Sequence, residues 1–504
     1  MYKKSIAKLS AVMVAMTLFS SVNVQSATVK TTKVVAKKSV VVAKKTTQTV
    51  KKPIVVVAKA TKVSPVKVVA VAAKIVKPTV AVAKVASVVV AKPTTVVTPV
   101  TAITAKTAVA PTTTVVQATK ATTVAPTTTV VQTAKATTTT STIVSGQTPV
   151  KTTDNLSTAL ASGKSLLLDA GSFSIATITK IASSVTIEGK ANTVINGNNS
   201  GSFSVAGLHD VEFKNIIFTN LTEMDFSNST NLKFTNCQFL NFTTSGVVLN
   251  TFNNVEFSNC IISKIGSINV DETWQGMGLY LVNGTNLKVH DSQISNTFGH
   301  GAIFLTNTSF QIYNNKIHDT FYRGIELYLS GNSGSIYNNN IYNCGSINTD
   351  HSGIGCNGIY GANASKVTVI SNIITNVLEN AVEGNFLSIE KNTIDGTGID
   401  MVNHPTPSGE GIYLEGSGKV IGNIIKNTHS SGIKSYSPLT ISNVDIEQNT
   451  ISNCDAADCA IDLNSDLGYS NINISNNKSY NNKECVGLRY NSRVNVILVN
   501  NTIN

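Results

Sequence analysis

From Leu232 to Asn504, short runs of alternating apolar and polar residues recur along the chain. Each run leads to an Asn and an Ile, then to a few polar residues and a small-Ile-x-Leu strand, as in the copy FQIYNNKIHDTFYRGIELYL that starts at Phe310. Copies return roughly every 20 to 33 residues, with almost no helix-forming sequence between them. Short strands separated by Asn and Gly turns at such a period predict a solenoid of stacked coils.

The residues before the first clear copy predict a cap for this solenoid. Asp154 is suited to begin a short helix that runs to about Ala161, and the strand-like runs LLLDAGSFSIATI and SVTIEGKANTVING follow it. An amphipathic helix at this place would cover the otherwise open edge of the first coil. We therefore expect an all-β solenoid domain over residues 150–504 with an N-terminal capping helix.

Two columns of Asn are expected where the coils turn. The first column contains Asn236, Asn259, Asp291, Asn314, Asn338, Asn372, Asn392, Asn423, Asn449 and Asn476. The second column contains Asn241, Asn296, Asp319, Asn343, Asn376, Asn427 and Asn453. Asn tolerates left-handed backbone geometry, and stacked amide side chains bond from rung to rung. We interpret both columns as structural.

A third column falls on the small-apolar-x-apolar strand and is expected to point outward. It contains Val248, Tyr280, Phe304, Glu326, Tyr360, Glu383, Tyr413, Lys434, Asp462 and Arg489. The apolar neighbours then point inward, because adjacent strand residues face opposite sides; they are Ile303, Ile325, Ile359, Val382, Ile412 and Ile433. With rungs about 4.8 Å apart, Glu326 and Glu383 would stand roughly 9 to 10 Å apart, with Tyr360 between them.

The repeats from about Thr152 to Asn504 resemble the right-handed parallel β-helix of the pectate-lyase-like superfamily. The resemblance implies a single-stranded, right-handed β-helix. It does not single out an activity, since the superfamily holds lyases, glycoside hydrolases, uronate epimerases and non-catalytic surface proteins. GHG at Gly299 and NTD at Asn348 match fragments of the polygalacturonase pattern in reverse order, and no DPHD-type epimerase motif is found.

The composition of the third column suits a sugar chain. Aromatic rings accept the C–H faces of pyranose rings, while carboxylates and a lysine can accept protons, bind a cation or donate hydrogen bonds. The residues expected to bind substrate are Tyr280, Phe304, Tyr360, Tyr413, Trp274 and Asn357. An ordinary exposed β-face, stabilised by cross-strand Tyr and Glu–Lys neighbours, would have a similar composition.

Long turns precede this strand in three coils, at Ser263–Met277, Gly345–Asn357 and Asp395–Glu410. They bring further polar and aromatic side chains to one edge: Trp274, Asp271, His351, Asp350, Asp400 and His404. Shorter turns place His300, Arg323 and Asn380 beside the column. Insertions confined to one edge of a repeat array usually build a binding wall, which favours a groove here. Trp274 is suited either to a sugar platform or to covering the end of a rung.

Two reaction types fit the candidate catalytic residues, which are Glu326, Glu383, Lys434, Arg323, His300 and Glu410. In an eliminative lyase, Glu326, Glu383 and Glu410 would hold Ca²⁺, and Lys434 or Arg323 would be the base. A lysine among carboxylates retains its proton, which opposes such a role for Lys434. In an inverting hydrolase, the two carboxylates stand about 6.5 to 9.5 Å apart, a limit that the Glu326–Glu383 pair approaches.

Charge divides the chain into two parts. The first 149 residues contain 21 Lys and no Asp or Glu, whereas the rest sets 19 Lys and Arg against 28 Asp and Glu, a formal charge of −9. Residues 1–27 have the layout of a secretory signal peptide, with basic residues before an apolar run and small residues after it. Export to the cell surface, the periplasm or the medium is therefore expected.

Residues 28–149 consist mainly of Val, Ala, Lys, Thr and Pro, with VAPTTTVVQ at both Val109 and Val124. Such a segment lacks the large side chains that offset backbone ordering, so we expect a disordered, low-complexity arm. It is compatible with a solvated stalk and with attachment to an anionic cell-envelope polymer. Its lysines interrupt every apolar run, so no transmembrane segment is expected, and without aromatic residues nucleic-acid binding is not expected either.

All seven cysteines lie in the solenoid. Cys237 and Cys260 occupy the same position in successive repeats, which favours buried thiols one rung apart, with a disulfide as the alternative. Cys454 and Cys459 flank a short loop and are a second possible pair. No CxxC spacing accompanies them, so metal binding by cysteine is not expected.

These observations lead to two hypotheses from different classes. In the first, a secreted or surface-associated β-helix binds an extended, acidic polysaccharide along the outward column and, in its enzymatic form, cleaves or epimerises it. In the second, the protein is a non-catalytic adhesin or cell-envelope structural protein, and the column is a solvated wall. The sequence does not decide between them.

Overall fold

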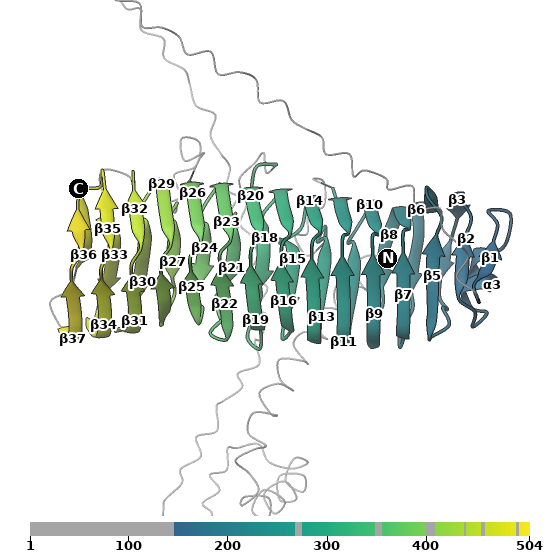
Figure 1. The fold of residues 1–504 in the computed structure, drawn as a ribbon, viewed down its shortest axis with the longest axis horizontal. Coiled ribbons are helices and arrows are strands. Elements are labelled where there is room, and N and C mark those ends of the chain that lie inside the picture. Colours follow the sequence, from purple (N-terminus) through teal and green to yellow (C-terminus); the bar gives the residue numbers. More distant parts are fainter. Residues whose placement is uncertain are drawn as a thin grey trace, which may run out of the picture. The chain divides into compact units, whose positions relative to one another are not determined.

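The computed structural model describes residues 146–267, 275–347, 355–398, 409–437, 440–454, 459–489 and 493–504. The predicted signal peptide, nearly all of the Lys-rich arm, and the middle parts of the three long turns lie outside these ranges. The described residues form a parallel solenoid whose strands lie side by side in chain order, from β1 at one end to β37 at the other (Figure 1). This confirms the predicted all-β, right-handed β-helix.

Each coil contributes strands to three faces, and every strand pairs in parallel with its counterpart in the next coil. One face, called here the ladder face, contains β4 (Thr177–Ile178), β15 (Gly301–Thr306), β18 (Arg323–Leu327), β21 (Ile359–Gly361), β24 (Val382–Gly384), β27 (Ile412–Leu414), β30 (Ile433–Ser437), β33 (Cys459–Ser465) and β36 (Glu484–Leu488).

The second face follows the ladder face along the chain. It contains β1 (Thr148–Val150), β2 (Leu166–Leu168), β5 (Val185–Gly189), β7 (His209–Lys214), β9 (Ser229–Thr235), β16 (Ser309–Tyr313), β19 (Ser333–Tyr337), β22 (Val367–Ile370), β25 (Ser388–Glu390), β28 (Gly418–Ile421), β31 (Ile441–Glu447), β34 (Tyr469–Ser475) and β37 (Arg493–Val499).

The third face completes the coil. It contains β3 (Gly171–Ser174), β10 (Gln238–Phe242), β12 (Ile261–Ile265), β14 (Gln293–Thr297), β17 (Lys316–Thr320), β20 (Asn340–Cys344), β23 (Ile373–Val377), β26 (Thr393–Thr397), β29 (Ile424–Thr428), β32 (Thr450–Ser452), β35 (Lys478–Tyr480) and β38 (Thr502–Ile503). Four long strands bend and serve two faces: β6 (Thr193–Ser204), β8 (Ile217–Asp225), β11 (Val247–Ser258) and β13 (Leu279–His290).

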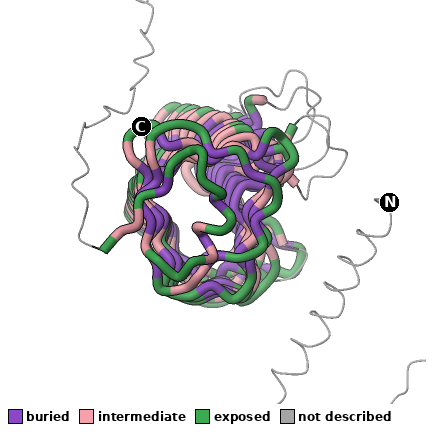
Figure 2. The backbone as a smooth tube through the Cα atoms, turned by 90° about the vertical axis from the view of Figure 1, so that its right-hand side faces the viewer, coloured by how far each residue is buried: buried purple, intermediate pink, exposed green. Residues whose placement is uncertain are grey.

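Viewed along the solenoid, the coils superpose around one apolar core, and buried positions alternate with exposed ones along the tube (Figure 2). In the N-terminal coils, Phe213, Phe234 and Phe257 stack ring on ring, with centroids 5.2 and 4.8 Å apart. The thiols of Cys237 and Cys260 are buried in the same core, and burial raises the pKa of Cys260 to about 12. This agrees with the prediction of buried thiols for this pair.

The capping helix α3 (Leu156–Leu160) covers the first coil with the buried side chains of Leu156 and Leu160. Its N-cap is Asn155, whose side chain accepts a 3.0 Å hydrogen bond from the Thr158 N–H. The prediction of a cap at Asp154 was therefore wrong by one residue. The Asp154 carboxylate instead accepts from the Lys151 N–H at 2.7 Å and closes the preceding turn.

The first predicted Asn column combines two structural columns. Its members Asn236, Asn259, Asp291, Asn314, Asn338 and Asn476 have positive φ values between 52° and 57° and lie at the corner after the second face. The members Asn372, Asn392, Asn423 and Asn449 belong to the next position along the chain and are buried. All seven residues of the second predicted column have positive φ, as expected for left-handed corners.

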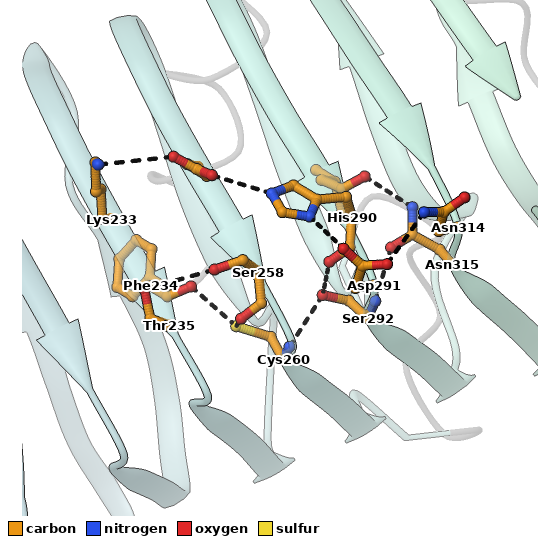
Figure 3. Close-up of polar contacts among 12 residues, drawn as sticks. Lys233, Phe234, Thr235, Ser258, Cys260, His290, Asp291, Ser292, Asn314 and Asn315 are labelled. Atoms are coloured by element: carbon orange, nitrogen blue, oxygen red, sulfur yellow. Dashed lines mark hydrogen bonds and ion pairs between the residues drawn. The ribbon is translucent and has the colours of Figure 1, made fainter.

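The second position forms a continuous Asn ladder, which is buried except at its half-buried last member and consists of Asn315, Asn339, Asn372, Asn392, Asn423, Asn449, Asn477 and Asn501. The amide of Asn372 shows the pattern, since its Nδ2 donates to Asn392 Oδ1 at 3.0 Å and to Ile336 O at 2.9 Å. The ladder begins at Ser292, whose backbone N–H donates to Asn315 Oδ1 (Figure 3). These bonds satisfy the polar groups that each coil turns toward the core.

Candidate functional site

The outward column lies in the predicted register. Strand pairing places each member of the column from Val248 to Lys434 opposite the next member, and this series ends at Asp462. The column also extends backward to Asp225 and Ser204. At the last coil the prediction was wrong, because Gly487, and not Arg489, pairs with Asp462. Arg489 lies two residues further on and still reaches the Asp462 carboxylate at 2.7 Å.

The inward neighbours of the column behave as predicted. Ile303, Ile325, Ile359, Val382, Ile412 and Ile433 all have an exposed fraction of 0%. Because the strand period is two residues, burial of these side chains directs the column itself away from the core.

A cleft of about 580 Å³ opens on the ladder face around Glu383. We call it the Glu383 cleft. Its lining residues are Arg323, Gly355, Asn357, Tyr360, Glu379, Asn380, Glu383, Glu410, Tyr413, Glu415, Lys434 and Tyr436. The cleft therefore brings together seven predicted site residues and Asn380, which was expected beside the column, although their coils are far apart in the sequence. The seven are Arg323, Asn357, Tyr360, Glu383, Glu410, Tyr413 and Lys434.

Tyr360 and Tyr413 are half-buried and stand on either side of Glu383, one rung away in each direction. The Arg323 guanidinium lies over the Tyr360 ring, with Cζ 4.2 Å from the ring centroid. Arg323 also pairs with Glu326 at 3.0 Å. These two contacts hold the guanidinium at one end of the cleft.

Glu326 lies below this end of the cleft and is 1% exposed. Its second carboxylate oxygen is 3.5 Å from Nδ1 of His300, which is itself largely buried. Glu326 is not among the residues that line the cleft. Its position suits it to neutralising and orienting Arg323 more than to contacting a bound molecule.

Glu383 is held by two side-chain amides. Nδ2 of Asn380 donates to its Oε2 at 2.8 Å, and Nδ2 of Asn357 donates to the same oxygen. Oδ1 of Asn380 in turn accepts from the backbone N–H groups of Gly409 and Glu410. The Glu383 carboxylate is thereby fixed by groups from two neighbouring coils.

Glu410 and Lys434 form an ion pair at the opposite end. Lys434 Nζ lies 2.6 Å from Glu410 Oε1, and Ser430 Oγ donates to the same oxygen at 3.1 Å. Glu410 is 1% exposed, so the ammonium compensates a buried charge. An ammonium bound in this way is not placed to act as a base.

Two cleft residues, Glu379 and Glu415, were missed by the sequence reasoning. The pKa of each carboxyl is raised, first by loss of solvent and then by the nearby charge of Glu383. Loss of solvent and the nearby charges of Glu383, Glu410 and Glu415 raise the pKa of Tyr413 to about 12. Both Glu residues flank the ladder strands β24 and β27, so a search limited to one position per coil passes over them.

Toward the N-terminus the column becomes an aromatic stack. Tyr280 and Phe304 are stacked with centroids 5.2 Å apart, and Phe304 is 5.5 Å from the ring of Tyr328. Phe304 has an exposed fraction of 0%, so it supports Tyr280 and does not present a face to a bound sugar. The predicted platform Trp274 lies outside the described residues, as do Asp271, Asp350, His351, Asp400 and His404.

The expected Ca²⁺ ligands do not form a common site. Among the described residues, no three His, Cys, Asp or Glu side chains come together in a way that could hold a metal ion. Glu326, Glu383 and Glu410 are engaged separately, by Arg323, by two amides and by Lys434. These three carboxylates therefore do not fit a shared Ca²⁺ ion.

The model of the family described as right-handed β-helix region matches residues 170–317 and 226–438. Together these matches span more than half of the 504 residues. The chain belongs to the right-handed β-helix family. Within the described ranges of this β-helix protein, no helix is long and apolar enough to cross a membrane.

Three solved structures illustrate the fold relationship of this β-helix protein. The A-module of mannuronan C-5 epimerase AlgE4 from Azotobacter vinelandii is 14% identical, with a TM-score of 0.36 over 67% of this chain and 91% of that chain. The surface adhesin PfbA of Streptococcus pneumoniae is 12% identical, with a TM-score of 0.41 over 65% and 84%. A mannuronic acid specific polysaccharide family 6 lyase from human gut microbiota is 12% identical, with a TM-score of 0.40 over 68% and 83%.

No curated protein sequence matches the chain. At these identities and TM-scores, the three structures are similar to this chain in fold alone. A shared fold does not fix an activity, so only the chemistry of the cleft bears on function.

Proposed function

We propose that this β-helix protein binds an extended polysaccharide along the ladder face, with the Glu383 cleft as the central part of the site. The observation that carries the proposal is the pair of half-buried tyrosines, Tyr360 and Tyr413, which line one cleft on both sides of a fixed carboxylate. Aromatic rings supply apolar contact to sugar rings, and the amides and carboxylates around them bind hydroxyl groups.

Isothermal titration with a panel of oligosaccharides tests this proposal. Tyr413→Ala should weaken binding about tenfold or more, because a central aromatic anchor is removed. Tyr337→Ala is the matched control, since Tyr337 is a half-buried tyrosine stacked at 4.9 Å on Tyr313 on the second face. Equal affinities of the Tyr413→Ala variant and the native protein, or no binding of any oligosaccharide, would leave a non-catalytic structural protein as the better account.

Cleavage of the bound chain is a second candidate, favoured by the raised pKa values of Glu379 and Glu415 beside Glu383. In hydrolysis, a protonated carboxyl group gives its proton to the glycosidic oxygen, and a carboxylate takes a proton from the attacking water. Hydrolysis would produce one new reducing end for each glycosidic bond that is cleaved. Ultraviolet-absorbing unsaturated ends would indicate elimination instead, and intact polymer after long incubation would indicate binding alone.

We further propose that the protein is exported and that its Lys-rich arm contacts an anionic cell-envelope polymer. The proposal rests on the charge of the first 149 residues, which contain 21 Lys and no acid. Salt screens such an attraction, so release from isolated envelopes should rise with ionic strength. Recovery in the cytoplasmic fraction, or retention that does not depend on salt, would count against it.

A further inference from the structure

The Glu383 cleft contains more acidic than basic side chains. Four glutamates, Glu379, Glu383, Glu410 and Glu415, line it together with two cations. Both cations are already bound to buried carboxylates, since Arg323 pairs with Glu326 at 3.0 Å and Lys434 with Glu410 at 2.6 Å. The positive charge at the two ends is therefore largely neutralised within the protein.

The remaining three carboxylates, Glu379, Glu383 and Glu415, line the same cleft. Across the described part of the chain, no Lys, Arg or His nitrogen lies within 4.0 Å of Glu379, Glu383 or Glu415. Glu379 accepts the Cys356 N–H at 2.8 Å, and Glu383 accepts the two amides. Loss of solvent and the charge of Glu383 raise the pKa values of Glu379 and Glu415, and the nearby Arg323 guanidinium offsets only part of this rise.

A buried amide oxygen adds an independent sign of a missing ligand. Asn357 has an exposed fraction of 0% and lines the cleft, and its Oδ1 has no hydrogen-bond partner among the described residues. A flipped amide would turn this oxygen toward the Glu383 carboxylate, so the orientation is set by charge. The oxygen lies close to Gly355, where an added Cβ would stand 2.5 Å from it, 2.9 Å from Glu379 Oε2 and 3.2 Å from Arg323 Nη2.

At one end of the cleft, the buried Nε of Arg323 is a donor without a partner among the described residues. The other open positions are the ionised carboxylates and the Asn357 amide oxygen, which are acceptors. Carboxylate oxygens and an amide oxygen can only accept hydrogen bonds, so the molecule they bind must supply donors. A uronate would bring a further carboxylate beside three carboxylates, which is unfavourable in a partly desolvated site. An ammonium group brings three donors and the missing positive charge.

We infer that the sugar chain taken by the Glu383 cleft carries ammonium groups, as a polymer of unacetylated amino sugars does. This inference rests on the proposed polysaccharide binding and narrows its substrate class. It replaces the acidic polymer expected from the sequence with a basic one. The ammonium of one residue lies against Glu383 and Glu415, while the neighbouring rings lie against Tyr360 and Tyr413.

Titration with three oligosaccharides of equal length tests the inference, with chitosan, chitin and mannuronate oligomers as probes. In mildly acidic buffer, the amines carry charge. Chitosan should bind at least about tenfold more tightly than chitin, since a hydrogen bond to a charged group contributes about 1.5 to 3 kcal/mol. Tighter binding of the acetylated or uronate oligomer would overturn the inference and leave the polysaccharide site in place. If none of the three oligosaccharides binds, or if Tyr413→Ala leaves their affinities unchanged, the proposed polysaccharide binding itself is wrong.

Proton release gives a second readout. Binding of an ammonium lowers the pKa of nearby carboxyl groups, so chitosan binding should release protons, seen as a buffer-dependent heat. Glu415→Gln should reduce both the release and the preference for chitosan over chitin. Glu390→Gln on the second face, where Glu390 ends β25, is the matched control and should change neither. Proton uptake on binding, or an unchanged preference in Glu415→Gln, would contradict the inference.

Discussion

Lys434 Nζ lies 2.6 Å from the carboxylate of Glu410, which is 1% exposed. The two residues belong to neighbouring coils, and the pair joins the floor of the cleft to its C-terminal end. A buried carboxylate without its cation is strongly destabilising. We expect Lys434→Met to lower the free energy of unfolding by about 3 kcal/mol, measured by denaturant unfolding.

The double variant Lys434→Met/Glu410→Gln separates charge from packing. Because it removes both charges, it should recover a large part of the stability that Lys434→Met loses. If the double variant loses more unfolding free energy than the two single variants lose together, the ion pair is not the reason why Lys434→Met is destabilising.

A second prediction about stability concerns the Asn ladder. Asn392→Ala removes the acceptor for both the backbone N–H and the Nδ2 of Asn372, and the donor to Val369 O. Each buried group left unsatisfied costs about 1 to 3 kcal/mol, so a loss of about 3 kcal/mol or more is expected. Hydrogen exchange should accelerate in the coils on either side of the change.

Asn427→Gly is the comparison for the Asn ladder. Asn427 lies at an exposed left-handed corner with φ +56°, a conformation that Gly adopts without strain. It should change stability by less than about 1 kcal/mol. Equal effects of the two substitutions would mean that the buried amide chain does not stabilise the solenoid.

The helical cap assigns different roles to two adjacent residues. Asn155→Ala removes the bond to the Thr158 N–H and should destabilise the first coil by about 1 kcal/mol. Asp154→Ala removes an exposed bond to the Lys151 N–H and should cost about half as much or less. Hydrogen exchange at Leu166–Leu168 measures both effects. A larger effect of Asp154→Ala than of Asn155→Ala would indicate that Asp154 is the N-cap.

The raised pKa of Glu379 predicts a pH dependence of stability. In the unfolded chain this carboxyl returns to its ordinary value of 4.5, so the folded state binds the proton more tightly. The stability that this group contributes is fully present below 4.5 and is lost as the pH rises through the raised value. Glu379→Gln should therefore raise Tm relative to the native protein at neutral pH, and the gain should vanish in acid.

Calorimetry at several pH values provides the check on Glu379. The control Glu390→Gln changes a glutamate outside the cleft, so it should not reproduce the gain in Tm that Glu379→Gln shows at neutral pH. A Glu379→Gln variant whose advantage grows in acid would contradict the raised pKa.

Much of the column was predictable because a strand repeats every two residues and the inward Ile positions are conspicuous. The error at Arg489 came from matching Gly487-Leu488-Arg489 with Gly432-Ile433-Lys434. The true register pairs Asp462 with Gly487. A slip of two residues keeps a side chain on the same face, and this is why Arg489 still reaches Asp462.

The two Asn positions were confused because both are often Asn, as at Asn314–Asn315 and Asn338–Asn339. One signal distinguished them, since the second position stays Asn where the first becomes Ser371, Lys391, Gly422 or Gln448. Burial within the outward column was not predictable in the same way. Phe304 and Glu326 are covered by side chains from other coils and turns, and no periodicity in the sequence reports such contacts.

A crystal structure soaked with a chitosan oligosaccharide tests the central claim most directly. The account predicts sugar rings lying against Tyr360 and Tyr413, with an amine nitrogen within hydrogen-bonding distance of Glu383 or Glu415. An ordered oligosaccharide on another face, with the Glu383 cleft left empty, would contradict it.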